Sequence, residues 1–446
     1  MAYGALGGGT FTVQNKVLPG TYTKMISQPK MTSVWQDRGF ATIALPLDWG
    51  EEGKIVTLTR ERLLNNAVSL LGHAYNDSEL KPIRDILKGA KVLHLYNLNG
   101  GGSKASVMAG SLKAEAVYPG VSGNSISLKV EAVLGAEKTY RVVTYFNGRE
   151  MDIQTIKKLD DFKKNGLITL SGTLDDSSKT VMSHLEGGKN GTVTGGAHDA
   201  YLKAIQGEYF NVIAYAGDDE GVKSLYESFI KTQVYDVGYM AQLVVHKSKT
   251  ANDRFITNLW YDAVGEGENA YDSIYWYLGK SAGVELGRSV SASLYDGEYE
   301  VEAVTDAFEA EDHIKKGHLV MMKSDGDIKI LEDINSLTSF TKEITEDWTL
   351  NEIVRIVIQR VQNISMLFNK YYMHKELNDD IGRSKLWADI AWSAKEQFQR
   401  QLRIIEDYKE EDTQVMKGEQ KGGVVIYDAI TPVVTMSKLY LTVAIA

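Results

Sequence analysis

The segment from Pro432 to Ala446, PVVTMSKLYLTVAIA, constrains the fold of this chain more than any other stretch. It contains no Gly and no Pro after Pro432, and it is rich in the Val, Leu, Ile, Thr and Tyr residues that favour strands. Strand side chains alternate between two faces, which gives Leu439, Leu441, Val443 and Ile445 on one face and Met436, Tyr440, Thr442 and Ala444 on the other. Both faces are mostly apolar, so the segment predicts a strand buried on both sides.

A second strand-like segment, Thr10–Leu18, lies near the start of the chain. Its apolar residues Phe11, Val13 and Val17 alternate, and it lies between a flexible start at Gly7–Gly9 and a turn at Pro19-Gly20. Each segment could pair within its own domain, or it could complete the sheet of a neighbouring subunit through main-chain hydrogen bonds. An unpaired apolar strand is an aggregation hazard for a monomer, but a protein that polymerises can use it. The pattern leaves both alternatives open.

Composition narrows the class of protein. A chain of 446 residues is long enough for about three domains, and 43% hydrophobic with 24% charged residues is ordinary for a globular protein. The net charge of −10 and the lack of a basic run argue against nucleic-acid binding. Because the sequence has no cysteine, disulfides, thiolate metal sites and cysteine nucleophiles are excluded. We find no signal-peptide pattern and no apolar run near the ~18 residues of a membrane span, so we expect folding in a cytoplasm and no direct membrane insertion.

An α/β pattern opens the chain after the arm. Phe40–Leu47 reads as a buried strand, and Thr59–Leu71 as a helix capped by Thr59. A second helix is expected at Ser78–Leu87 with Ser78 as its cap, followed by the nearly continuous apolar strand Ala90–Leu98. Such a strand is typical of a parallel sheet covered on both faces, so this region predicts an α/β domain.

The pattern changes to all-β from Ala105 to Leu174. Ser125–Val133 and Thr139–Phe146 alternate as strands, and Asn147-Gly148 is a type I′ hairpin signal. The α/β pattern resumes after Gly187–Gly196; its expected elements are a helix at Ala197–Ile205, a strand at Phe210–Ala216, a helix at Gly221–Val234, a strand at Gln242–His246 and a hairpin around Ser324–Asp327. We therefore predict a β-sandwich, residues 104–184, inserted into a discontinuous α/β domain, residues 33–103 and 185–340.

The last domain, residues 341–446, reads as α+β. An apolar stripe from Leu350 to Phe368 predicts one long helix, and Arg383–Tyr408 predicts a second that ends in the acidic run Glu406–Asp412. The strand-like segment Gly422–Ala429 and the terminal strand follow. With the N-terminal arm, residues 1–32, the fold class is α/β and α+β multidomain.

Three motifs suggest chemistry, and each also has a structural explanation. Gly279–Gly283 matches the G-x-S-x-G nucleophile elbow after an apolar stretch read as a strand, which would make Ser281 a hydrolase nucleophile. The elbow also needs a following helix and later Asp and His partners, which the sequence does not offer, so small residues for close packing are favoured. Gly100–Lys104 lacks phosphate-loop spacing and favours a domain crossing. A metal site from His313, Glu309, Asp312 and His318 is outweighed by a solvated helix face.

Several stretches, taken in order, resemble the contractile tail sheath proteins of bacteriophages, defective prophages and R-type bacteriocins. They are Leu18–Tyr22, Tyr118–Ile126 with its tyrosine-proline-glycine and glycine-asparagine pairs, Lys280–Gly283 with Ser289 and Tyr295-Asp296-Gly297, and Glu332–Thr338 followed by Arg355, Asn363 and Gly382-Arg383. Each motif alone is weak, but their shared order from end to end makes the resemblance specific. The sandwich loop with Arg141, Asn147 and Arg149 departs from the family and cannot be aligned.

The resemblance implies a structural polymer rather than an enzyme. The central domain would be subtilisin-like without an active site, and the two chain ends would be exchanged between subunits. The exchange residues implied are Phe11, Val13, Val17, Val434, Met436, Leu439, Leu441 and Val443. Subunits would stack as hexameric rings around a tail tube protein, with baseplate and tail terminator proteins as further partners and no cofactor. Charged residues of the second helix, Arg383, Lys385, Lys395, Arg400 and Arg403, would face the tube.

We expect such a sheath to be assembled in the bacterial host cytoplasm, to belong to a virion tail or tail-like particle, and to contract so that the tube crosses the target envelope. Gly7–Gly9 and Gly418–Gly423 are the expected flexible points. A serine hydrolase using Ser281 and a non-contractile structural or binding module remain the alternatives.

Overall fold

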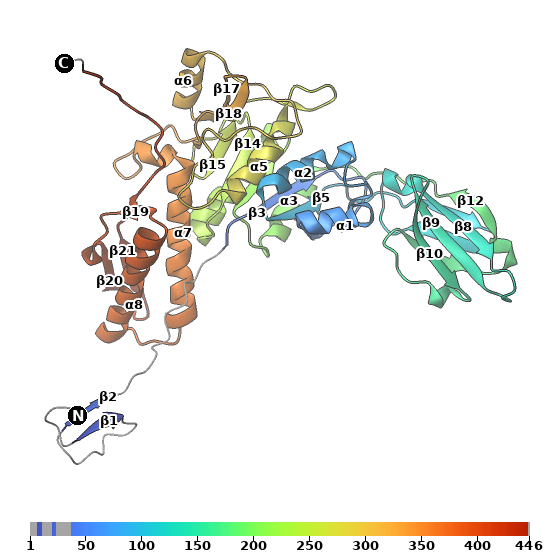
Figure 1. Cartoon of the computed structure of the whole chain (residues 1–446), viewed down its shortest axis with the longest axis horizontal. Helices are drawn as coiled ribbons and strands as arrows, with labels where there is room; N and C mark the ends of the chain where they lie inside the picture. The colour runs from blue at the N-terminus through green and yellow to red at the C-terminus, as the bar shows by residue number, and fades with distance from the viewer. Residues whose placement is uncertain (1–6, 11–19, 24–36, 445–446) are drawn as a thin grey trace. The chain divides into compact units, whose positions relative to one another are not determined.

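The computed structural model describes residues 7–10, 20–23 and 37–444. The chain divides into two compact units, Met1–Trp35 and Gln36–Ala446 (Figure 1). In the first unit, β1 (Gly7–Thr10) pairs in parallel with β2 (Gly20–Thr23). Gly7–Gly9, expected to be a flexible start, belong to this paired strand, and their flexibility stays a prediction.

The predicted strand Thr10–Leu18 overlaps the described residues at Thr10 alone, which ends β1. Phe11, Val13 and Val17 lie outside the described residues. Their expected exchange between subunits therefore stays a prediction.

A seven-stranded sheet forms the centre of the second unit. Its order is β16-β15-β14-β13-β3-β5-β4, and all neighbours are parallel except β4 and β5. The strands are β3 (Phe40–Leu45), β4 (Ile55–Leu58), β5 (Val92–Asn97), β13 (Val212–Tyr215), β14 (Gln242–His246), β15 (Ile256–Leu259) and β16 (His318–Leu319). The predicted parallel sheet is confirmed.

Helices cover both faces of this sheet. Ala41, Ile43 and Leu45 of β3 enter one core, while Ala44 enters the other, as strand alternation requires. The first core contains residues of α1 (Arg60–Leu71), α2 (Lys81–Gly89) and α5 (Ile274–Gly283). The second contains residues of α3 (Gly195–Ile205), α4 (Glu220–Lys231) and α7 (Asn351–Leu367). Two-sided burial explains why the strands are almost continuously apolar.

The cap of α1 is as predicted, since the Thr59 side chain accepts a hydrogen bond from the amide of Arg62. The second helix differs from its prediction. Asp77, not Ser78, occupies the N-cap position of a 3₁₀ turn, η1 (Ser78–Leu80), which continues as α2. Pro82 in the first turn of α2 is compatible with this start, because its missing N–H has no partner there in any helix.

Two antiparallel sheets form a sandwich between β5 and α3. One has the order β10-β9-β8-β12 and the other β11-β7-β6. The strands are β6 (Ser106–Ala109), β7 (Leu112–Ala116), β8 (Ile126–Ala132), β9 (Tyr140–Phe146), β10 (Arg149–Ile156), β11 (Ile168–Gly172) and β12 (Thr180–His184). Asn147 and Gly148 join β9 to β10 with φ of 50° and 74°, as the predicted type I′ turn requires.

The chain enters and leaves the sandwich along adjacent paths. The amide of Ser103 donates to the carbonyl of Lys189 at 2.9 Å, and the amide of Lys189 returns a bond to Ser103 at 3.0 Å. A Cβ on Gly191 would lie 2.1 Å from the carbonyl oxygen of Gly100. A Cβ on Gly102 would lie 2.6 Å from the carbonyl oxygen of Lys189. Gly100–Lys104 is therefore a domain crossing, where Gly102 and Gly191 allow the two backbones to touch.

A small hairpin and one helix follow the sheet. β17 (Met321–Ser324) pairs with β18 (Asp327–Ile330) around the predicted Ser324–Asp327 turn, and α6 (Ala307–Lys315) precedes β16.

The C-terminal region packs α8 (Asp380–Trp392) and the π-helical η9 (Ser393–Gln401) beside short strands. These are β19 (Ile405–Glu406) with β22 (Thr431–Pro432), and β20 (Thr413–Lys417) with β21 (Val424–Asp428). The remaining helical turns are η2 (Val121–Ser125), η3 (Leu159–Asp161), η4 (Asp176–Ser178), η5 (Thr232–Val237), η6 (Ala270–Ser273), η7 (Glu346–Thr349), η8 (Phe368–Tyr372) and η10 (Glu410–Asp412). No helix among the described residues combines the length and the apolar character that a membrane span needs.

Two predictions for this region are wrong. The helix expected over Arg383–Tyr408 ends at Gln401, and the acidic run Glu406–Asp412 lies in β19 and the turns that follow it. Arg403 and Asp407 adopt positive φ of 57° and 53°, which stops a helix.

The glycine-rich stretch Gly418–Gly423 is the loop of the β20–β21 hairpin, where the amide of Gly418 donates to the carbonyl of Gly423.

Candidate functional site

The G-x-S-x-G match lies in a helix. The preceding segment, expected to be a strand, forms α5, and Gly279–Gly283 is its last turn. Ser281 is 1% exposed, whereas a nucleophile elbow presents its serine on a strand-to-helix turn. Ser281 therefore lacks both the strand-to-helix turn and the exposure that the hydrolase alternative requires.

The small residues of this motif allow two helices to touch. A Cβ on Gly279 would lie 2.1 Å from the carbonyl oxygen of Ile86 in α2, and one on Gly283 would lie 1.9 Å from that of Gly89. Real Cβ atoms do not approach so closely, so α2 and α5 can pack here with glycine alone. The prediction of close packing is confirmed.

The possible metal group on α6 does not converge either. His318 stacks on Trp260 with ring centroids 3.7 Å apart, and its Nδ1 lies 3.1 Å from Nδ1 of His313. Asp312 is bonded to Lys316 at 2.5 Å, and Glu309 reaches His313 at 4.0 Å. The four side chains belong to two separate arrangements, and we assign no metal site to them.

A buried ion pair links the sheet to the C-terminal region. Asp333 and Arg355 are each 1% exposed, and Oδ2 of Asp333 accepts from Nη2 of Arg355 at 2.6 Å. The other oxygen, Oδ1, accepts from the Tyr277 hydroxyl at 2.9 Å and from Nδ2 of Asn351 at 3.0 Å. Burial alone would raise the pKa of Asp333, but the charge and hydrogen bond of Arg355, with bonds from Val290 and Asn351, hold it below its ordinary value.

Main-chain bonds reinforce the same joint. The amide of Asn351 donates to the carbonyl of Asp333 at 3.0 Å, and the Asn335 side chain donates to the carbonyl of Trp348 at 2.7 Å. Asp333 and Asn335 belong to the Glu332–Thr338 motif. The sequence identified this motif and Arg355 as separate matches to the family. It did not predict that they meet and fix the start of α7.

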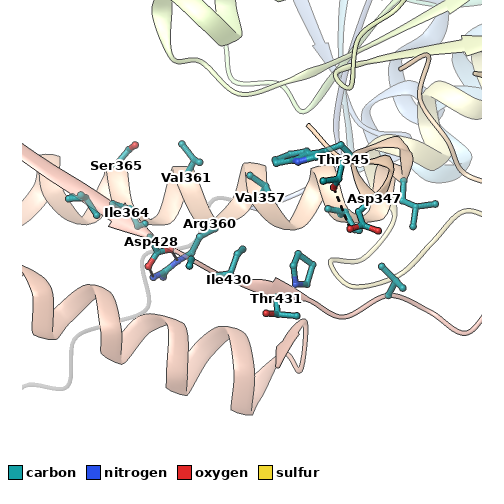
Figure 2. A pocket seen from close by; sticks show the side chains of 17 residues that line it. Thr345, Asp347, Val357, Arg360, Val361, Ile364, Ser365, Asp428, Ile430 and Thr431 are labelled. Carbon is teal, nitrogen blue, oxygen red and sulfur yellow. Dashed lines mark hydrogen bonds and ion pairs between the residues drawn. The ribbon is translucent and has the colours of Figure 1, made fainter. Parts of the chain in front are cut away.

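The apolar stripe of α7 serves two different contacts. Val354 and Ile358 are buried against the sheet, whereas Ile353, Val357, Val361 and Ile364 are half-buried and follow one another at helical spacing. These four line one wall of a groove of about 770 Å³ (Figure 2). The apolar residues from Leu350 to Phe368 therefore cover two sides of α7, one against the sheet and one against the groove.

The opposite wall of this groove is formed by β21 and the segment after it. Ile426 comes from β21, and Ile430, Pro432 and Val434 follow it. Asp428 accepts a two-pronged bond from Arg360, with Nε–Oδ2 at 2.7 Å and Nη2–Oδ1 at 2.8 Å, and both side chains are largely buried. Figure 2 shows this pair between α7 and the segment that carries Ile430 and Thr431. The ion pair fixes the distance between the two apolar walls.

The apolar C-terminal segment is uncovered. Val433 and Thr435 hold its start: the amide of Val433 donates to the carbonyl of Ile404 at 2.9 Å, and the amide and hydroxyl of Thr435 donate to the Glu352 carboxylate at 3.2 and 3.0 Å. Beyond Thr435 the side chains are exposed, at 104% for Met436, 86% for Leu439, 75% for Leu441 and 77% for Val443, while Val434 is 41% exposed. Residues 433–444 form no helix or strand in this chain (Figure 1). The predicted strand buried on both faces is thus absent from the single subunit.

The basic residues proposed to face a tube are mostly paired within the chain. Lys385 bonds Glu376 at 3.1 Å, Lys395 bonds Glu410 at 2.9 Å and Arg400 bonds Glu396 at 2.7 Å. Arg383 pairs with Asp380. Arg403 lies beyond η9, in the turn with positive φ. Arg383, Lys385, Lys395 and Arg400 lie on the continuous helix formed by α8 and η9, as expected, and Arg403 lies outside it. Their contact with a tube stays a prediction.

The architecture defines a class of structural protein: a parallel sheet with an inserted sandwich, followed by an α+β region whose groove and apolar tail are open. Models of four tail sheath domains match successive parts of the chain. They are the domain III N-terminal region at residues 38–98, the beta-sandwich domain at 99–197, the central domain at 191–336 and the C-terminal domain at 343–446. The chain belongs to the phage tail sheath proteins, and it is a structural subunit of a tail sheath.

Individual proteins agree with this assignment. A sheath tail protein from Desulfitobacterium hafniense is 27% identical, with 95% of this chain and 99% of that chain covered and a TM-score of 0.81. The phage-like element PBSX protein XkdK of Bacillus subtilis (strain 168) is 26% identical over 99% of this chain and 100% of its own length. The helical sheath of the anti-feeding prophage in its contracted state shares the fold at 13% identity, covering 96% of this chain and 99% of that chain, with a TM-score of 0.56.

Proposed function

We propose that this subunit polymerises by lending its ends to neighbouring copies, as stacked hexameric rings around a tail tube, and that the resulting sheath shortens to drive the tube through a target envelope. The observation that carries the proposal is the apolar segment Met436–Val443, which is exposed in the single chain. Burying one large apolar side chain stabilises an association by about 1.5–3 kcal/mol. Four or five such side chains therefore give a substantial driving force for pairing, before the costs of association.

The acceptor in the neighbouring copy is the groove beside α7 and the open edge of the β20–β21 hairpin. A two-stranded sheet has unpaired main-chain groups along its outer edges, which are templates for a further strand. Val425 and Tyr427 of β21 are 50% and 59% exposed, as expected for side chains that another segment covers. The subunit's own tail contributes Val434 to the groove and then leaves it, so the remaining apolar wall is open to a strand from another copy.

The N-terminal arm is the second donor that we propose, through Phe11, Val13 and Val17. The chain division that fits this scheme is an arm at residues 1–32, a subtilisin-like sheath domain without an active site at 33–103 and 185–340, a sandwich at 104–184 and a tube-facing domain at 341–446. In this scheme shared strands persist while the rigid domains rotate during contraction. Separate interfaces of ~1,600 Å² would have to dissociate first.

The tail tube protein, the baseplate and the tail terminator are the partners of this proposal, and no bond-making reaction is part of it. Contact with the tube falls to the C-terminal domain. Lys385, Lys395 and Arg400 already have acidic partners within the chain. Acidic groups of the tube would have to replace these partners, so we propose Arg403 as the first of the five positions to contact the tube. The particle is a virion tail or a related phage-tail-like structure, assembled in the host cytoplasm.

Deletion of residues 436–446 tests the proposal, since it retains Val434 in the groove and the Thr435–Glu352 bond. We expect a folded monomer with unchanged thermal unfolding that forms no tubes in negative-stain microscopy, while the full chain forms them. Lys438→Ala is the matched control, because it changes the same segment without removing apolar surface, and it should assemble. Normal tubes from the deleted chain would falsify the exchange.

Two groove variants locate the acceptor. Val361→Glu places a charge on the apolar wall, whereas Asn369→Glu places it about two turns further on, at an exposed position of η8 that does not line the groove. We expect assembly to be lost in the first variant and kept in the second. A discrete monomer or small ring of the unmodified chain at every concentration in light scattering would instead favour a non-contractile binding module.

A further inference from the structure

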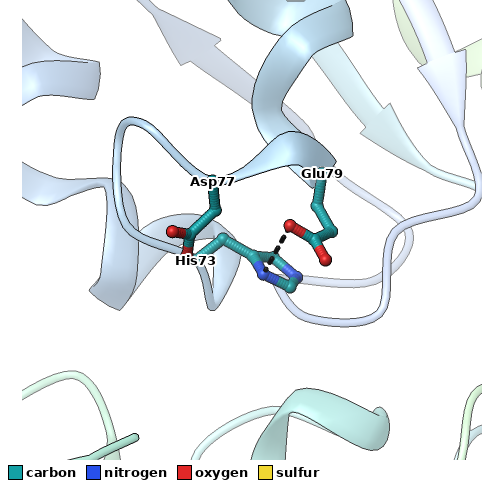
Figure 3. Close-up of side chains that lie close together, drawn as sticks. All are labelled: His73, Asp77 and Glu79. Carbon is teal, nitrogen blue, oxygen red and sulfur yellow. Dashed lines mark ion pairs between the residues drawn. The ribbon is translucent and has the colours of Figure 1, made fainter.

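One group of metal-ligating side chains lies outside every contact described above. His73, Asp77 and Glu79 follow α1, and one donor atom of each lies within 4.8 Å of the donor atoms of the other two (Figure 3). Nδ1 of His73 is 3.7 Å from Oε2 of Glu79. Asp77 is held in place, because its Oδ2 accepts from the amide of Ala74 at 2.6 Å.

A third carboxylate fixes the orientation of the imidazole. Nε2 of His73 lies 2.8 and 3.0 Å from the two oxygens of Asp48. In the neutral ring the Nε2 proton then points at Asp48, which leaves the lone pair of Nδ1 on the side of Glu79. Histidines that bind metals characteristically donate their other ring N–H to a carboxylate in this way, since the bond fixes the tautomer and makes the ring a better ligand.

Electrostatics also favour a positive charge at this point. A lone pair and two carboxylates that converge without a positive charge repel one another, and Asp48 adds a third negative charge behind the ring. An imidazole with two carboxylates is a ligand set suited to divalent first-row transition metals. We propose that His73, Asp77 and Glu79 bind one such cation, with Asp48 as the positioning residue.

The geometry needs a closure on binding. Two ligands of one tetrahedral Zn²⁺ lie roughly 3.4 Å apart, because each bond is about 2.0–2.2 Å long, whereas the donor atoms here lie within 4.8 Å of one another. The side chain of Glu79 is 53% exposed, so it can rotate inward to close this difference.

The site lies where the sheet domain meets the sandwich. The Ser122 hydroxyl is 3.3 Å from Nε2 of His73, and the amide of Ser122 donates to the carbonyl of Asp48 at 3.4 Å. A Cβ on Gly120 would lie 1.9 Å from the same carbonyl oxygen. Ser122 and Gly120 belong to the Tyr118–Ile126 motif of the sandwich, so a cation at His73 would stiffen this joint.

The test uses the full chain without a histidine tag, stripped with EDTA and titrated with Zn²⁺ in a calorimeter. We expect one binding event at this site and a rise in melting temperature, both removed by His73→Ala and by Glu79→Gln. Asp48→Asn retains the three ligands and should weaken binding about 10–100-fold. His184→Ala, at an exposed histidine of β12, is the matched control and should bind as the unmodified chain does.

Glu79→Gln guards against misfolding, because it changes an exposed side chain and keeps its size. The proposal is overturned if the unmodified chain shows no Zn²⁺-dependent heat or melting shift. It is equally overturned if His73→Ala and Glu79→Gln bind Zn²⁺ like the control, since a proton on His73 would then be the cation that balances the carboxylates.

Discussion

Two apolar segments of this chain, β14 and the stretch Leu439–Val443, have similar strand-like sequences and opposite surroundings. Every residue of β14 is buried between two layers of helices, whereas Leu439, Leu441 and Val443 are exposed. A hydrophobic pattern states that a segment needs cover, but it does not state which chain supplies the cover. In β14 the cover is intramolecular; for the tail we propose that it comes from another subunit.

The largest difference between the two segments should appear when a charge is placed in each. Val244→Asp buries a carboxylate in β14 and is expected to lower the free energy of unfolding by more than about 4 kcal/mol. Leu441→Asp should change monomer stability by less than about 0.5 kcal/mol and yet prevent assembly. Urea unfolding and negative-stain microscopy measure the two effects. Equal destabilisation by both variants would show that the tail is covered within its own subunit.

The same contrast separates buried from exposed ion pairs. Asp333→Asn leaves Arg355 charged and buried, and it should cost about 3–5 kcal/mol. Asp199→Asn breaks the exposed Asp199–Lys203 pair of α3 and should cost at most about 0.5 kcal/mol. Chemical denaturation of both variants checks this difference. The double variant Asp333→Leu/Arg355→Met should recover part of the loss, because it removes both charges; failure to recover would mean that the joint needs these hydrogen bonds.

Glycines offer a smaller comparison between a covered and an open position. Gly283→Ala forces a methyl group against the backbone of α2 and should cost about 1–3 kcal/mol. Gly422→Ala, in the β20–β21 loop, meets nothing within 4 Å and should be close to neutral. Thermal unfolding compares them. A neutral Gly283→Ala would contradict the direct backbone contact between α2 and α5.

The smallest effect concerns pH. Burial, with the charges of His313 and Lys316, lowers the pKa of His318 from its ordinary 6.5 to about 4. Between these values the unfolded chain binds a proton that the folded chain does not, so the free energy of unfolding should fall as pH drops from 6.5 toward 4. For a half-buried ring we expect a loss of about 1 kcal/mol. His318→Asn should lack this component in unfolding measured at pH 7 and pH 4.5, and an unchanged slope would contradict it.

Periodicity predicted the elements best where a segment is covered by its own neighbours. The parallel strands, the Thr59 cap and the Asn147-Gly148 turn follow from local patterns that tertiary contacts reinforce. The predicted elements were wrong where an apolar stretch suits a strand and a helix equally, or where the backbone conformation of one residue ends a helix. The stretch before Gly279, Ile274–Leu278, is apolar on every side because this part of α5 is buried on every side, so it resembled a strand. The Arg383–Tyr408 helix stopped early because Arg403 turns to positive φ, which no periodicity signals.

The candidate sites divide in the same way. The resemblance supplied Asp333 and Arg355 as separate motif residues, but their meeting depends on bringing the loop after β18 to the first turn of α7. His73, Asp77 and Glu79 are near in sequence, yet Asp48, which orients the imidazole, comes from a loop 25 residues earlier. The groove beside α7 is formed by segments about 70 residues apart, so no local window contains it.

By itself the sequence determined the class of each region, the inserted sandwich and the tail sheath family, because these depend on local periodicity and on motif order. The tertiary structure alone decided that Ser281 is a packing residue, that the stripe of α7 has two sides, and that the apolar C-terminal segment is uncovered. Burial is a property of what surrounds a side chain, and a linear pattern records the need for such surroundings without recording where they come from.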